Sequence, residues 1–213
     1  ILIGLVGSEM CIRDSNMSHD IRTPMNAILG YAQLMENELN GKDIPEALEH
    51  LEKLQQSGNL LLSIINNVLD MARIESGRME IDENYAQIEA IWQNLFELFE
   101  DEAKKKNIVF HYKVDVEHKH ILTDVTKIEE IFVNIMSNAM KYTLSGGFVT
   151  VNVEELPCDE SGYIIVRTRV SDTGIGMSQD YLTKIFEAFT REKNTTKSKI
   201  AGTGLGMSIV KNY

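Results

Sequence analysis

The chain has 213 residues, 43% of them hydrophobic and 25% charged, a composition typical of a globular protein with one large or two small domains. Its net charge of −11 argues against nucleic acid as a partner, because an acidic surface repels a phosphate backbone. The two cysteines, Cys11 and Cys158, have no metal-ligand spacing and indicate no disulfide framework, so a reducing compartment fits.

Residues 1–15 do not match the pattern of the rest of the chain. Their apolar start is far shorter than the roughly 20 residues that cross a bilayer, and it lacks the features of a signal peptide. The run from Met10 to Ser15 can be read as a translated transposase adapter from sequencing-library preparation, with the codons ATG TGT ATA AGA GAC AG. We interpret residues 1–15 as an artefact and exclude them from the fold; a linker from an upstream helix is the alternative.

Residues 16–78 are predicted to form a helical hairpin. From Leu48 to Ala72, inward positions recur in alternating steps of three and four, and a second apolar row widens the stripe at Leu54, Leu61 and Val68. Because one partner helix cannot cover so wide a stripe, we expect a homodimer that closes a four-helix bundle. A hairpin that packs only on its own second domain is the alternative.

The first helix of this hairpin is expected over residues 16–39, followed by a turn over residues 40–45. Gly41 is a helix stop, and Pro45 fits the start of the second helix. On the first helix, the side chains that we expect to face inward are Met17, Ile21, Ile28, Tyr31 and Met35.

His19 is predicted to face solvent, about 200° around the helix from the apolar positions two residues before and after it. Asp20 is adjacent, and Thr23 shares the face of His19 one turn later. Pro24 removes a backbone hydrogen bond and bends the helix beside the histidine. Because a neighbouring carboxylate favours one imidazole tautomer, the other ring nitrogen is left free to attack phosphorus. The pattern therefore indicates a nucleophilic histidine; an ordinary exposed histidine is the alternative.

A linker over residues 79–85 leads to a second predicted domain over residues 86–213. Its first helix, over 88–105, has an apolar face that we interpret as core: Ile88, Ile91, Trp92, Leu95, Phe96 and Phe99. The further predicted elements are strands at 108–115 and 120–123, a helix at 126–141, strands at 147–156 and 163–171, and a helix that begins near Leu205. Helices on one face of a mixed sheet make an α/β sandwich.

Two asparagines, Asn134 and Asn138, lie one turn apart on a predicted helix, and Lys141 follows a turn later. Because asparagine is a mediocre helix former, two of them pointing inward beside Ile131 and Ile135 indicate a function. An amide oxygen is a ligand suited to Mg²⁺, and an ammonium group suits a phosphate. A polar helix surface is the alternative.

Asp172 ends a predicted strand and opens the run Asp-Thr-Gly-Ile-Gly. Its carboxylate can accept a hydrogen bond from the exocyclic amine of adenine, while Gly174 and Gly176 let the base approach the backbone closely. An ordinary turn is the alternative for this motif alone. A second glycine-rich run favours phosphate at the free N–H groups of the last helix, and it consists of Gly202, Thr203, Gly204, Leu205 and Gly206.

Between these two motifs, residues 186–199 are polar, basic and without periodicity. Such a segment is typical of a mobile lid, here over a triphosphate. Arg191 and Lys193 are its candidate phosphate contacts.

In their order along the chain, four segments resemble the sensor histidine kinases of two-component signalling: Met17–Met25, Asn134–Thr143, Asp172–Met177 and Gly202–Met207. The resemblance spans nearly all of residues 16–213. It implies an α+β fold in which a dimeric phosphoacceptor hairpin precedes an α/β sandwich of the Bergerat (GHKL ATPase) type, truncated at its C-terminus. It also implies a bacterial kinase, of the hybrid type.

The resemblance also implies roles for individual residues. His19 is the phosphoacceptor, Asp20 orients and deprotonates it, and Thr23 serves dephosphorylation of a partner regulator. Asn138 ligates Mg²⁺, and Phe186 and Phe189 anchor the base of the lid. The implied ATP-binding residues are Asn134, Lys141, Tyr142, Asp172, Gly174, Gly176, Phe189, Arg191, Lys193, Gly202, Thr203, Gly204, Leu205 and Gly206.

The expected activity is autophosphorylation with ATP, followed by phosphotransfer to an aspartate of a separate or fused response-regulator receiver domain. A hydrolytic ATPase of the GHKL superfamily and an inactive nucleotide-binding scaffold are the alternatives. The hydrolytic enzymes need a glutamate on the helix that carries Asn134; here Asn134 holds that place, and Glu130 lies one turn earlier.

The chain stops at Tyr213, inside the helix that begins near Leu205, whereas family members continue to a further strand. Because so short a helix is marginal, we expect weak ATP binding and aggregation without the missing segment. The resemblance further implies the cytoplasmic portion of a sensor that reaches a membrane only through missing upstream segments.

Overall fold

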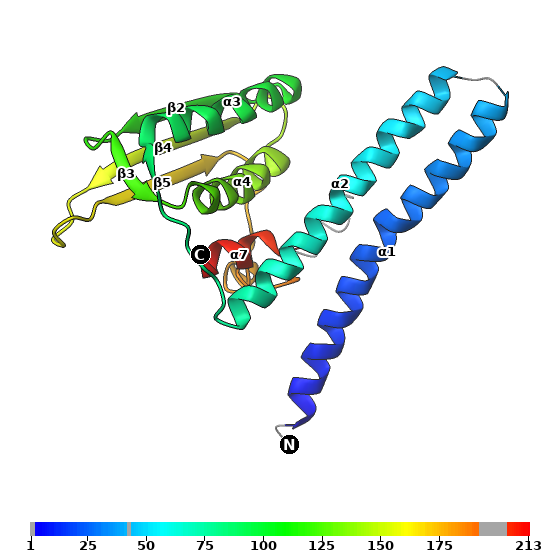
Figure 1. Cartoon of the computed structure of the whole chain (residues 1–213), viewed down its shortest axis with the longest axis horizontal. Coiled ribbons are helices and arrows are strands. Elements are labelled where there is room, and N and C mark those ends of the chain that lie inside the picture. Colours follow the sequence, from blue (N-terminus) through cyan, green and yellow to red (C-terminus); the bar gives the residue numbers. More distant parts are fainter. Residues whose placement is uncertain (1–2, 42–43, 192–203) are drawn as a thin grey trace. The chain divides into compact units, whose positions relative to one another are not determined.

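The computed structural model describes residues 3–41, 44–191 and 204–213 (Figure 1). Side chains are described from Asp20 onward within these ranges, except at residues 40, 41 and 75. The described residues divide into two compact units. One contains the chain up to Met79 together with two short segments, 188–190 and 204–205, and the other contains the remainder.

The first unit is a hairpin of two long helices, α1 (Ile3–Gly41) and α2 (Ile44–Glu75) (Figure 1). Helix α1 begins well before the predicted residue 16, because no proline interrupts the chain upstream of that position. The two helices are separated only by residues 42 and 43, so the connection is shorter than the predicted turn. Pro45 lies in the first turn of α2, where a missing N–H costs nothing.

The wide apolar stripe of α2 divides into two rows. Ala47 and Ile64 are buried, whereas Leu48, Leu62 and Leu69 are more than half exposed. On α1 the described side chains predicted to face inward are all half-buried: Ile21, Ile28, Tyr31 and Met35. One partner helix therefore covers only one of the two rows, and the row predicted as core from Leu48 onward is largely exposed in the single chain.

A polar contact joins the two helices near their connection. The imidazole Nδ1 of His50 on α2 lies 2.8 Å from Oε2 of Glu38 on α1, and both side chains are mostly buried. The ring of Tyr31 stacks on the imidazole with a centroid separation of 5.6 Å. These contacts fix the pairing of α1 with α2 near the connection.

The second unit contains the predicted strands and helices with small shifts at their ends. Its elements are β1 (Asn84–Gln87), α3 (Ile88–Lys106), β2 (Val109–Asp115), β3 (His120–Thr123), α4 (Val125–Tyr142), β4 (Phe148–Leu156), β5 (Ile165–Asp172), α5 (Gln179–Leu182) and α7 (Gly206–Asn212). Strand β1, which the sequence did not predict, pairs antiparallel with β3. It has only four residues, mostly exposed, so no apolar alternation marks it.

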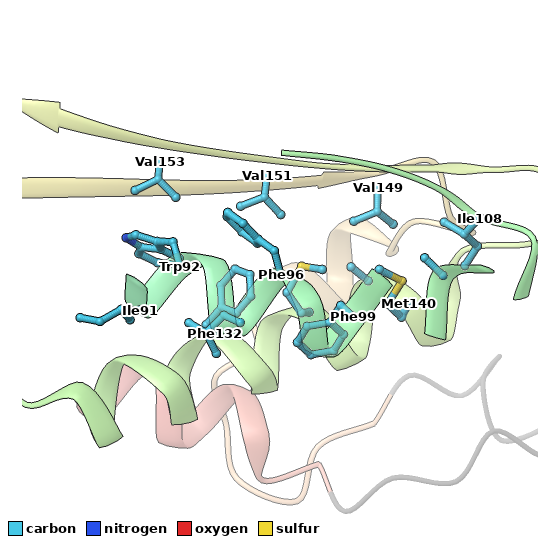
Figure 2. Packing of buried hydrophobic residues seen from close by; sticks show 14 of the residues in the cluster. Ile91, Trp92, Phe96, Phe99, Ile108, Phe132, Met140, Val149, Val151 and Val153 are labelled. Carbon is cyan, nitrogen blue, oxygen red and sulfur yellow. The ribbon is translucent and has the colours of Figure 1, made fainter. Parts of the chain in front are cut away.

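The larger sheet has the strand order β2-β4-β5, with β2 and β4 parallel and β4 and β5 antiparallel. A parallel pair needs a long crossover, which here includes β3 and α4. Helices α3 and α4 cover one face of this sheet (Figures 1 and 2). The mixed sheet with helices on one face confirms the predicted α/β sandwich.

The core lies between this sheet and its helices, as Figure 2 shows. Val149, Val151 and Val153 point from β4 toward α3 and α4 and are at most 1% exposed. Aromatic rings fill the helical side: Phe132 meets Trp92 edge-on at 5.3 Å between centroids. All six apolar residues predicted as the core face of α3 are buried.

The buried face of α4 differs from the predicted one. It is formed by Phe132, Met136, Ala139 and Met140, whereas Ile131 and Ile135 are half-buried. The helix is thus rotated by about one residue, or 100°, from the expected orientation, because the large Phe132 ring fits among the aromatic side chains of α3. Asn134 and Asn138 are consequently half-buried beside the core and do not point into it.

Asp124 closes the N-terminus of α4 and also holds the chain that leads into the unit. Its Oδ1 accepts a hydrogen bond from the backbone N–H of Lys127 at 3.1 Å, an N-cap bond. Its Oδ2 accepts one from the backbone N–H of Asp82 at 3.0 Å. One carboxylate therefore fixes both the start of α4 and the segment before β1.

Candidate functional site

The half-buried face of α4 meets the start of α7 at Asn134. The Asn134 Nδ2 donates a hydrogen bond to the carbonyl of Glu130 at 2.9 Å, which orients the amide. A Cβ atom at Gly206 would lie 2.6 Å from Oδ1 of Asn134, so any other residue there would require the asparagine side chain to shift. Gly206, which has no Cβ, therefore lets the first turn of α7 approach the asparagine.

Asn138 lies one turn further along the same face and is half-buried. No group of three or more His, Cys, Asp or Glu side chains able to hold a metal occurs in the part of the chain that the structure describes. Mg²⁺ commonly keeps several waters and takes its other ligands from one or two protein oxygens and the phosphates of a nucleotide. The single amide oxygen of Asn138 fits a metal held in this way.

Positive charges gather at the C-terminal end of α4. Burial lowers the pKa of Lys141, and the nearby charges of Arg191 and Lys106 lower it further. The Lys141 Nζ also lies 5.1 Å from the ring centroid of Tyr142. An anion bound here would offset the mutual repulsion of these cations and the cost of burying one of them.

Lys106 is a member of this cluster that the sequence did not predict. It ends α3, and its Nζ donates a hydrogen bond to the carbonyl of Met140 in the last turn of α4 at 3.3 Å. In the sequence it is one of three lysines at a helix C-terminus, where they are expected to complement the helix dipole. Only the packing of α3 against α4 brings it to Lys141.

The turn after β5 contacts the end of α4. The backbone N–H of Ile175 donates to the carbonyl of Tyr142 at 3.3 Å, and a Cβ at Gly174 would lie 2.6 Å from that carbonyl oxygen. The Asp172 Oδ1 accepts a hydrogen bond from the Gly174 N–H at 2.9 Å, which shapes the turn. Gly176 follows with a φ of 66°. The predicted Asp-x-Gly motif and the predicted Asn/Lys helix therefore meet.

The segments around Phe189 and Gly204 pair with each other. The Phe189 N–H donates to the carbonyl of Gly204 at 3.0 Å, and Phe189 has a φ of 60°, which is unfavourable for a bulky side chain. Leu205 is fully buried. Phe186 lies under the Nζ of Lys211, 5.9 Å from the ring centroid. Three predicted site residues lie outside the described residues: Lys193, Gly202 and Thr203.

The predicted phosphoacceptor region lies within α1. His19 is part of this helix, but its side chain lies outside the described residues. Asp20 follows it and is half-buried, and Thr23 is exposed one helical turn after His19. Pro24 is buried inside α1. The helix therefore gives His19 and Thr23 the expected spacing of one turn.

A cavity of about 400 Å³ lies near the ends of β2 and β4. Its lining includes Asp115, His118 and Glu155, and none of its lining residues belongs to the predicted site. The imidazole Nδ1 of His118 lies 2.7 Å from Oε1 of Glu155, so these two side chains in the lining contact each other.

A helical hairpin with a histidine-bearing first helix, followed by an α/β sandwich with this glycine and asparagine arrangement, defines a class of protein. Two family models match the two parts: the His Kinase A (phospho-acceptor) domain over residues 15–77, and the Histidine kinase-, DNA gyrase B-, and HSP90-like ATPase over residues 123–213. The chain belongs to the sensor histidine kinases of two-component systems.

Curated relatives are similar over almost the whole chain. The Autoinducer 2 sensor kinase/phosphatase LuxQ of Vibrio parahaemolyticus is 33% identical over 201 residues, which are 93% of this chain and 23% of LuxQ. A sensor-like histidine kinase of Rhizobium meliloti is 36% identical over 197 residues, 92% of this chain and 36% of the relative. The chain thus spans roughly a quarter to a third of the length of these relatives.

Solved structures of histidine kinases share the fold. Full-length ShkA in complex with AMPPNP has a TM-score of 0.64 and 30% identity, covering 93% of this chain and 39% of ShkA. ThkA in complex with the response regulator protein TrrA has a TM-score of 0.57 and 25% identity, covering 86% of this chain and 50% of ThkA. None of the described helices combines the length and the hydrophobicity needed to cross a membrane.

Proposed function

We propose that this chain binds ATP in its α/β unit and transfers the γ-phosphoryl group to His19 of the hairpin. The observation that carries the proposal is the meeting of three motifs on α4. Asn134 contacts Gly206 at the start of α7, Lys141 lies among cations, and the carbonyl of Tyr142 contacts the turn that follows Asp172. The proposed phosphate-binding and base-reading motifs thereby both adjoin α4.

This arrangement supports part of the proposed set of nucleotide contacts. Lys141 and Arg191 would bind phosphate oxygens, because both are cations at the end of α4. Asp172 would accept from the exocyclic amine of adenine. The remaining proposed nucleotide contacts are Asn134, Tyr142, Gly174, Gly176, Phe189, Lys193, Gly202, Thr203, Gly204, Leu205 and Gly206.

In the proposed reaction, an imidazole nitrogen of His19 attacks the γ-phosphorus of ATP. A bond from nitrogen to phosphorus forms, the bond from phosphorus to the bridging oxygen breaks, and ADP leaves. Asp20 holds the ring and accepts the proton from its other nitrogen. Asn138 would hold Mg²⁺, which when bound neutralises charge on the phosphates.

We propose that phosphohistidine then passes its phosphoryl group to an aspartate of a separate or fused receiver domain. The complex of the similar kinase ThkA with a response regulator supports a partner of this kind. Thr23 shares a face with His19 and would orient a water toward the acyl phosphate of that partner. The name of LuxQ, a sensor kinase/phosphatase, is in line with this second activity.

We also infer that the hairpin is a homodimer. Apolar side chains on both helices are exposed in the single chain, and a second hairpin would cover them: Met25, Leu29, Leu48, Leu62, Ile65 and Leu69. Burying such side chains stabilises a four-helix bundle at roughly 25 cal/mol per Å². The proposed division is 16–78 for this hairpin, 79–85 for a linker and 86–213 for the ATP-binding domain, with residues 1–15 as an artefact.

A hydrolytic ATPase is the competing function. Such an enzyme would need a carboxylate on α4 to activate a water molecule, whereas the side chain of Asn134 is an amide. The carboxylate of Glu130, one turn earlier, lies 3.0 Å from the Nζ of Lys127 and forms an ion pair with it. The residues of α4 therefore support transfer to a histidine over hydrolysis.

Labelling with γ-phosphate tests the proposal. We expect the chain, incubated with γ-labelled ATP and Mg²⁺, to acquire an acid-labile label that His19→Gln abolishes. His50→Gln is the matched control, because His50 lies on the same hairpin and contacts Glu38, and this variant should keep the label. Label that persists in His19→Gln would contradict the assignment of the phosphoacceptor.

A further inference from the structure

A buried hydroxyl without a partner lies at the end of α4. Thr143 caps this helix and is 6% exposed. In the described part of the chain, its Oγ1 is the one buried side-chain nitrogen or oxygen that has no hydrogen-bond partner. A buried polar group in this state destabilises the folded protein, so its presence calls for a physical reason.

The helix end does not need this hydroxyl. The backbone N–H of Thr143 already donates to the carbonyl of Ala139 at 3.1 Å, which completes the last turn. A valine has nearly the same shape and would fill the same space without a polar atom. For the free protein alone, valine would therefore be the more stable choice at this position.

The neighbours of Thr143 place it beside the turn that carries the proposed base-reading carboxylate. Gly147 lies between two threonines: a Cβ there would be 2.6 Å from Cγ2 of Thr143 and 2.9 Å from Oγ1 of Thr173. Thr173 directly follows Asp172, and its own hydroxyl accepts a hydrogen bond from the N–H of Phe148 at 2.9 Å. Of the two threonine hydroxyls, only that of Thr143 is left without a partner.

We propose that Thr143 is a positioning residue for the nucleobase, whose hydroxyl gains its hydrogen-bond partner only in the nucleotide-bound state. The cost of the unpaired hydroxyl in the free protein is then offset when the nucleotide binds. This inference rests on the proposed nucleotide function and assigns to its base end a residue in addition to Asp172. Since Thr143 adjoins the base end, its contribution is the same for ADP and ATP.

The test compares Thr143→Val with Thr143→Ser in the full chain. We expect Thr143→Val to bind ADP and a non-hydrolysable ATP analogue about tenfold more weakly by calorimetry, with equal losses for both. The same variant should melt at an unchanged or higher temperature without nucleotide. Thr143→Ser keeps the hydroxyl and should restore binding. Thr150→Val is the matched control, because Thr150 lies on β4 between the buried Val149 and Val151 and so on the other face of the sheet. This variant should bind as the wild type does.

The outcomes separate this inference from the proposed function. Wild-type affinity in Thr143→Val would overturn the role of the hydroxyl. A lower melting temperature or a failure to fold in Thr143→Val would also overturn it, because the hydroxyl would then have a partner in the free protein. If the wild type itself bound neither nucleotide, the proposed function would fail, and the inference with it.

Discussion

The hairpin and the α/β unit differ in how much of their apolar surface each buries by itself. In the α/β unit, Met136, Val149 and Val151 are 0% exposed, and aromatic rings fill the space between sheet and helices. In the hairpin, Leu48 and Leu62 remain 57% and 59% exposed. A sheet covered by helices encloses a volume, whereas two helices meet only along a line.

This difference indicates how each part is stabilised. A unit with an enclosed core can fold as an independent domain. A hairpin with an exposed apolar row needs a further surface to cover it, and in the proposed homodimer, where a second copy supplies that surface, its stability would depend on protein concentration. The comparison can be tested by changing one side chain in each part.

The largest effect is expected for Leu62→Asp in the hairpin. A charge would be buried without a partner in the proposed bundle, so the dimer should dissociate and the hairpin should lose helicity. Leu98→Asp in α3 is the matched control, because Leu98 is 60% exposed, almost the same as Leu62 in the single chain. Sedimentation and circular dichroism should detect a large change for Leu62→Asp and almost none for Leu98→Asp. Equal behaviour of the two variants would mean that Leu62 is an ordinary surface residue.

Phe96→Ala should damage the other part of the molecule. Phe96 is 1% exposed and its ring contacts those of Trp92 and Phe132. Removing a buried ring leaves a cavity and costs about 3–5 kcal/mol of unfolding free energy. Urea denaturation followed through Trp92 should show this loss, while sedimentation still reports a dimer. A dimer that dissociates in this variant would contradict the independence of the two parts.

The sequence predicted the elements better than it predicted which side chains they bury. The spacing of apolar residues and the turn residues predicted the helices and the main strands, because these depend on local pattern. The choice between Phe132 and Ile131 as the core residue of α4 could not be predicted, since both are large and apolar and only the aromatic rings of α3 decide it. Lys106 and Thr143 were missed because their significance arises from the approach of distant segments.

Burying the ammonium group of Lys141 in the α/β unit destabilises the folded protein. Because its pKa is lowered from its ordinary 10.5, mainly by burial, the unfolded chain binds this proton more tightly than the folded one. The unfolding free energy of the wild type should therefore rise with pH between the lowered pKa and 10.5. Lys141→Met should remove this rise and stabilise the free protein near neutral pH.

The same variant should weaken nucleotide binding at the phosphate end. We expect Lys141→Met to bind ATP at least about tenfold more weakly, with a smaller loss for ADP, because a charged contact to phosphate is removed. Calorimetry and pH-dependent denaturation measure the two effects. Lower stability of Lys141→Met at neutral pH would show that the ammonium group is favourable in the free protein.

The smallest structural effect is expected for Thr23→Ala in the hairpin. Thr23 is exposed, so the unfolding free energy should change by less than about 0.5 kcal/mol and the labelling of His19 should continue. Loss of label from a phosphorylated receiver domain should nevertheless become slower. Unchanged decay of that label would contradict the proposed role of Thr23 in dephosphorylation.

The carboxylate of Asp124 has a mechanical consequence. It caps α4 and holds the backbone of Asp82, so a pull on the chain entering the α/β unit is applied directly to the first turn of α4. Asn134 lies ten residues further, about 15 Å along the same helix at 1.5 Å per residue. One carboxylate therefore links the segment through which the chain enters the unit to the helix that carries Asn134 beside Gly206.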